Sequence, residues 1–159
     1  MVGSCVVRLF RYQEQDSTQT LREGLDEFYT AHRSAVSMPC DLRAASASIF
    51  VGHDISHVIF GLTPSLVDEA ITDARIMLAT DVGLRRYWHA FTTDPHAIAN
   101  FERIGAASVA AGAVLALPRI WRAMREAWHI DKRWPWAPPE SFHARALGDL
   151  RREFRIRVI

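Results

Sequence analysis

The chain has 159 residues, a length typical of one domain, and 49% of them are hydrophobic, which is enough for a sizeable core. Its 19 basic and 18 acidic residues leave a net charge of +1, so the composition excludes a global nucleic-acid-binding signature. Cys5 and Cys40 form no paired metal-binding motif and indicate a reducing compartment or nothing at all. Residues 1–10 carry no convincing secretory signal, and the longest uncharged run, residues 104–118, is too short to span a bilayer.

Helical periodicity dominates the chain, and the only strand candidates are residues 6–7 and 155–159. We therefore predict an all-α fold, a single-domain multi-helix bundle over residues 1–159. A first helix is expected behind a capping cluster at residues 16–18. Apolar side chains then recur at helical spacing, at Leu21, Leu25, Phe28 and Tyr29.

Prolines and glycines divide the middle of the chain. After Pro39, a second helix is expected to begin past Asp41 and to end at Gly61. A third helix is expected to run from Pro64 to about Thr80. Thr63 is its predicted cap, because proline is favoured at the first helical position that follows a cap.

Further helices are expected in the second half. Residues 84–91 have a helical pattern, and a long helix is expected from Asp94-Pro95 to about Trp128, kinked at Pro118. Residues 134–139 are rich in proline and predict a rigid extended linker. Residues 142–154 form a last amphipathic segment.

A pair of histidines is the most informative feature of the chain. His53 and His57 stand at i and i+4, so on a helix they lie on one face and can reach the same metal ion. Glu69 follows the predicted turn. At about 1.5 Å per residue, His57 and Glu69 each lie roughly 6–8 Å from that turn. An antiparallel hairpin would therefore bring Glu69 opposite His57 and close a metal site.

The segment His53 to Glu69, HDISHVIFGLTPSLVDE, resembles the ubiquinone biosynthesis protein family called Coq-four, through its pattern of H-D-x-x-H, eleven residues and E. The mostly helical layout and the arginine-rich segment at residues 147–156 add to the resemblance. The segment after Glu69 lacks the family's usual lysine, so the chain resembles a divergent, bacterial-type member.

The resemblance implies a function. It implies a zinc-type metal ion and action on polyprenylated quinone precursors, either by replacing the ring carboxyl with hydroxyl or by organising a biosynthetic complex. The implied partners are such a precursor or another isoprenoid lipid, other quinone-biosynthesis proteins and a membrane surface. The expected location is cytoplasmic and peripheral to the inner membrane, a homodimer is left open, and no nucleic-acid partner is expected.

The donor set fits this chemistry. Two neutral imidazoles and two carboxylates suit zinc, manganese or iron(II), and an open position could hold an oxygen of a ring substrate. We assign His53, His57 and Glu69 as ligands. Asp54, about 100° round the helix from His53, is interpreted as a fourth ligand or as a catalytic base that orients a ligand imidazole.

Three other classes of protein use similar residues. A metalloprotease would use Asp54 to activate a zinc-bound water, although the usual strand framework is missing. A metal-dependent phosphohydrolase would use His53-Asp54 with His32 and a downstream carboxylate such as Asp94. A non-catalytic, metal-stabilised scaffold or lipid carrier would use the same ligands as the enzyme, and the sequence does not separate the two.

Two surface features have alternative interpretations. The small residues between Gly105 and Gly112 permit close approach, either by a neighbouring helix or by an apolar chain in a lipid-binding groove. Tryptophans interleaved with basic residues over 119–136 are typical of half-buried aromatics, but also of contact with a membrane interface.

Overall fold

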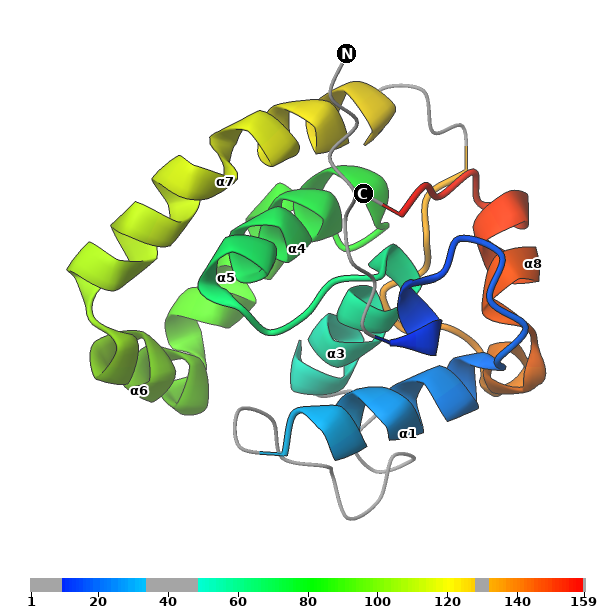
Figure 1. The fold of residues 1–159 in the computed structure, drawn as a ribbon. Helices are drawn as coiled ribbons and strands as arrows, with labels where there is room; N and C mark the ends of the chain where they lie inside the picture. Colours follow the sequence, from blue (N-terminus) through cyan, green and yellow to red (C-terminus); the bar gives the residue numbers. More distant parts are fainter. Residues whose placement is uncertain (1–9, 34–48, 128–131, 159) are drawn as a thin grey trace.

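The computed structural model of the chain describes residues 10–33, 49–127 and 132–158. Within these ranges helices are joined by turns, and only isolated bridges are present in place of strands, which confirms the all-α prediction (Figure 1). The strand candidate at residues 155–158 is irregular, and residues 6–7 lie outside the described ranges. The elements are η1 (Arg11–Gln13), α1 (Leu21–Ala31), α3 (Ile49–Phe60), α4 (Leu66–Ala79), α5 (Leu84–Thr93), α6 (Pro95–Ile104), α7 (Ala106–Ala127), η2 (Glu140–Ala144) and α8 (Leu147–Glu153).

Helix α1 covers one side of α3 with its predicted apolar face. Its cap differs from the prediction. Thr20, and not the cluster at residues 16–18, begins the helix, because Glu23 stands at the third helical position and completes a reciprocal capping box with Thr20. The four apolar side chains predicted to form its buried face lie in the core, at Leu21, Leu25, Phe28 and Tyr29.

Helices α3 and α4 form the predicted hairpin. Helix α3 ends at Phe60, before Gly61 at φ +70°, a conformation that favours glycine. The predicted beginning of this helix, after Asp41, lies outside the described residues.

The predicted cap of α4 is wrong by two residues. Ser65 caps the helix, because the Asp68 backbone N–H donates to its hydroxyl. The Thr63 hydroxyl instead donates to the Asp68 carboxylate, at 2.6 Å. Thr63 thus binds the side chain of Asp68 and does not cap the helix. Pro64 precedes the helix and does not occupy its first position.

The helix predicted to run from Pro95 to about Trp128 is in fact two helices. Gly105 separates α6 from α7 with φ +84°. Helix α7 then packs along α4 (Figure 1). A Cβ on Gly112 would lie 3.0 Å from Leu66 Cβ and 3.1 Å from the Leu66 carbonyl oxygen. Gly112 therefore serves the packing of α7 on α4. Leu66 occupies the space beside it, so Gly112 does not line a lipid-binding groove.

The C-terminal segment encloses the end of α3. The amphipathic segment predicted over 142–154 contains the end of η2 and the whole of α8. Buried Arg151 on α8 donates to the Val58 and Ile59 carbonyls at 2.8 and 2.9 Å. Carbonyls in the last turn of a helix have no partner within the helix, so Arg151 satisfies two of these groups and fixes the end of α3 that carries His57.

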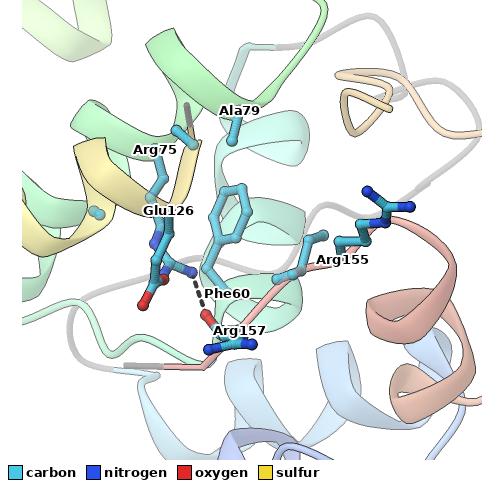
Figure 2. Close-up of a pocket in the computed structure, with 9 residues that line it drawn as sticks. Phe60, Arg75, Ala79, Glu126, Arg155 and Arg157 are labelled. Atoms are coloured by element: carbon cyan, nitrogen blue, oxygen red, sulfur yellow. Dashed lines mark hydrogen bonds and ion pairs between the residues drawn. The ribbon is translucent and has the colours of Figure 1, made fainter. Parts of the chain in front are cut away.

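A second arginine joins α4 to α7. Arg75 is buried, donates to Glu126 at 2.9 Å and to the Arg157 carbonyl at 2.8 Å, and lies over the Phe60 ring (Figure 2). Burial lowers the pKa of Arg75 to about 10, against the opposing effect of Glu126. These groups line a small cleft together with apolar side chains such as Ala79 and Ile156.

Candidate metal centre

The hairpin brings His53, His57 and Glu69 together. One ligand atom from each of the three lies within 4.8 Å of the others. His53 Nε2 lies 3.4 Å from Glu69 Oε2, and His57 Nε2 lies 3.3 Å from Glu69 Oε1. The glutamate thus faces both histidines, as the antiparallel arrangement predicts.

These separations suit a shared cation better than direct hydrogen bonds. A charge-assisted hydrogen bond from nitrogen to a carboxylate is about 2.7–2.9 Å long. Two donors that bind one tetrahedral zinc ion at about 2.0–2.2 Å are separated by about 3.3–3.6 Å. Both nitrogen-to-oxygen distances fall in the second range, so each histidine is placed to share a metal ion with Glu69.

His57 is held in the orientation that a metal ligand needs. Its side chain is buried, at 1% exposure, and its ring stacks on Phe28 with centroids 5.4 Å apart. Thr72 Oγ1 lies 3.2 Å from His57 Nδ1 and donates its hydrogen to the Asp68 carbonyl at 2.8 Å. A hydroxyl has one hydrogen, so Thr72 accepts from Nδ1–H, and the lone pair of neutral His57 is on Nε2.

That lone pair is left facing a carboxylate. Among the residues that the structure describes, no hydrogen-bond partner reaches His57 Nε2. A buried acceptor without a donor is unfavourable, and a facing Glu69 oxygen adds repulsion. A cation between the two atoms removes both penalties.

The charges of the site favour a bound cation. Burial alone would lower the pKa of His53, but the Glu69 and Asp73 carboxylates outweigh it and raise this pKa to about 9. Burial would raise the pKa of Glu69, but the two histidines lower it to about 2. In the absence of a metal, a proton on His53 therefore supplies the positive charge that the carboxylates stabilise.

Asp54 lies beside this cluster but is not one of its three members. Its carboxylate is buried and accepts a hydrogen bond from the Tyr29 hydroxyl at 2.9 Å. Burial raises the pKa of Asp54 to about 6, although His53 and the Tyr29 hydrogen bond oppose the shift. Its role as a ligand or catalytic base stays a prediction.

Sequence reasoning missed three neighbours of the site. Thr72 orients His57, Asp73 Oδ1 lies 3.4 Å from His53 Nε2, and Tyr87 donates to that same oxygen. Asp73 could have been found, because it follows Glu69 at the same i, i+4 spacing that joins the histidines. Nothing in the local pattern marks Tyr87, which comes from α5.

The alternative ligand sets do not assemble in the described part of the chain. His32 Nε2 lies 3.3 Å from the Tyr12 hydroxyl and its ring packs against Phe28, so it does not join the cluster. Asp94 caps the end of α5 and is not part of the cluster either. The phosphohydrolase interpretation therefore finds neither His32 nor Asp94, the two residues named for it, at the cluster.

Comparison of the chain with protein-family models, curated proteins and solved structures gives no match. The search for membrane spans finds no described helix that is both long and apolar enough to cross a bilayer.

Proposed function

We propose that this chain is a divalent-metal-binding protein in which His53, His57 and Glu69 hold the ion. One observation carries the proposal: the buried Nε2 of His57, oriented by Thr72 and without a hydrogen-bond partner among the described residues, faces Glu69 across 3.3 Å. Zinc suits two imidazoles and a carboxylate best, and iron(II) or manganese also fit.

The chemistry of such a centre follows from its residues. A bound ion would act as a Lewis acid toward an oxygen of a substrate. The Glu69 side chain is 34% exposed whereas His57 is buried, so a substrate would reach the ion from the Glu69 side. In the metal-free protein, burial raises the pKa of Asp54 to about 6 and Tyr29 holds its carboxylate beside the histidines, so Asp54 is the candidate base of the site.

For the biological role, we propose action on polyprenylated quinone precursors, or their organisation, in ubiquinone (coenzyme Q) biosynthesis. The support is the resemblance of residues 53–69 to the Coq-four motif together with the hairpin geometry expected for that motif. Exposed apolar side chains on α7 beside arginines support the proposed contact with a membrane surface: Val114, Leu115, Leu117 and Trp121. Location at the inner membrane and contact with other quinone-biosynthesis proteins belong to the same proposal.

A metal-stabilised scaffold is the second candidate. The ligands come from two helices, so a bound ion would join α3 to α4 whether or not any reaction occurs. Complementation of a quinone-deficient strain separates the two roles. An Asp54→Asn variant that keeps its metal but fails to complement supports an enzyme, and full complementation supports the scaffold.

Metal content tests the ligand assignment. Purified protein should hold about one divalent ion per chain by elemental analysis, with mass spectrometry identifying any lipid that copurifies. His57→Ala should lose the ion, because each ligand contributes a large part of the affinity of a three- or four-ligand site. His32→Ala is the control, since only the phosphohydrolase interpretation needs His32. Full occupancy in His57→Ala, or loss in His32→Ala alone, would contradict the assignment.

A further inference from the structure

A fourth donor lies next to the cluster on α4. Asp73 follows Glu69 by one helical turn, and its Oδ1 lies 3.4 Å from His53 Nε2. This separation equals that between His53 and Glu69, and it lies within the about 3.3–3.6 Å expected for two donors on one tetrahedral zinc ion. Two i, i+4 pairs therefore face each other across the hairpin: histidines on α3 and carboxylates on α4.

Asp73 is oriented by a buried tyrosine. The Tyr87 hydroxyl donates to Asp73 Oδ1, the oxygen that faces His53. The Tyr87 side chain is buried at 3% exposure and packs with Ile76 and Val82, and its ring meets Trp136 edge-on at 5.7 Å. A hydrogen bond from a fixed donor restricts the rotamers of a carboxylate, as partners of metal ligands commonly do.

The aspartate within the histidine motif is placed differently. The Asp54 carboxylate is buried at 6% exposure and accepts from Tyr29 on α1. The Asp73 side chain is 35% exposed and lies beside Glu69, on the side from which an ion can enter.

We propose that Asp73 is the fourth protein ligand of the metal centre, that Tyr87 positions it, and that Asp54 is not a ligand. The proposal rests on the metal-binding function proposed above, and it assigns a donor set of two histidines and two carboxylates. The unpartnered Nε2 of His57 faces Glu69 at 3.3 Å, which is an independent indication that this cluster binds a cation. With a divalent ion and neutral imidazoles the centre has no net charge.

Paired substitutions test this assignment. Asp73→Asn and Asp54→Asn each remove one negative charge near the ion, so they are matched in charge and size. Zn²⁺ affinity is measured by calorimetry in competition with a chelator, and circular dichroism checks the fold. We expect Asp73→Asn to lose more affinity than the about 10–100-fold typical of residues that only support a ligand, and Asp54→Asn to lose less than Asp73→Asn. Tyr87→Phe should lose about 10-fold.

Cobalt gives a second readout. The absorption of bound Co²⁺ depends on the number and kind of its ligands, so its spectrum should change in Asp73→Asn and stay the same in Asp54→Asn. Wild-type affinity in Asp73→Asn would overturn the proposal, as would equal losses in both variants, which would indicate an effect of charge alone. Absence of binding by the wild-type protein would instead refute the proposed metal-binding function itself, so the two failures are distinguishable.

Discussion

Replacing Thr72 by valine should weaken metal binding without a matching loss of stability in the metal-free protein. Valine keeps the shape of threonine but removes the hydroxyl that accepts from His57 Nδ1. In the metal-free protein the imidazole can move its hydrogen to Nε2 and donate it to Glu69, 3.3 Å away. A metal bound to Nε2 prevents this change of tautomer, so in the variant the buried Nδ1–H is left without an acceptor.

The magnitude follows from that difference. A buried N–H without a partner costs about 1–3 kcal/mol. The cost arises only in the metal-bound state, so it appears as a loss of affinity. With about 1.4 kcal/mol per factor of ten, we expect Zn²⁺ to bind about 5–150-fold more weakly. This range includes the about 10–100-fold typical of groups that orient a metal-bound histidine.

Thr80→Val is the matched control. Thr80 is the C-cap of the same helix, is fully buried and donates to the carbonyl four residues earlier, as Thr72 does. It has no contact with a histidine among the hydrogen bonds of the described residues. Calorimetric Zn²⁺ titration and urea unfolding of both variants, with and without the metal, provide the comparison. Equal affinities for Zn²⁺ in Thr72→Val and Thr80→Val would refute the reasoning about the His57 tautomer.

Three further predictions concern packing, the end of α3 and the acid beside the site. Gly112→Leu should destabilise the fold by about 1–3 kcal/mol in urea unfolding, because Leu66 occupies the space that the new side chain needs. Ala111 is exposed, so Ala111→Leu should change stability by less than about 0.5 kcal/mol. Equal effects of the two substitutions would contradict the α4–α7 contact. Arg151→Met should cost at least about 3 kcal/mol, since it removes a buried guanidinium and takes its hydrogen bonds from the Tyr12 and Ile59 carbonyls. Arg152→Met removes only surface ion pairs and should cost less than about 1 kcal/mol. Asp54→Asn should retain zinc by elemental analysis yet fail to complement a quinone-deficient strain; wild-type complementation would exclude a catalytic role.

The sequence predicted the hairpin well because its signals are local. The spacing from His53 to Glu69, with Gly61 between the helices, determines which side chains face each other once the two helices pack antiparallel. Glu69 opposite His57 required no knowledge of the remaining fold.

The caps and the long helix were predicted less well, for a physical reason. A hydroxyl near a helix end caps it only if no stronger partner engages it, and Asp68 engages Thr63. Gly105 adopts a positive φ between α6 and α7, whereas the pattern on both sides of it reads as one continuous helix.

The residues that hold Asp73 and Asp54 in place were the hardest part of the site to predict from the sequence. Tyr87 reaches Asp73 from α5, and Tyr29 reaches Asp54 from α1, so both contacts depend on packing between helices distant in sequence. Only Asp73 left a local signal, its position one turn after Glu69.

Anomalous diffraction at the zinc absorption edge, from crystals of the zinc-loaded protein, tests the central claim most directly. We predict one peak per chain, within about 2.0–2.2 Å of His53 Nε2, of His57 Nε2 and of a Glu69 oxygen. A zinc-loaded crystal without a peak between α3 and α4, or with its zinc held by other residues, would contradict the account.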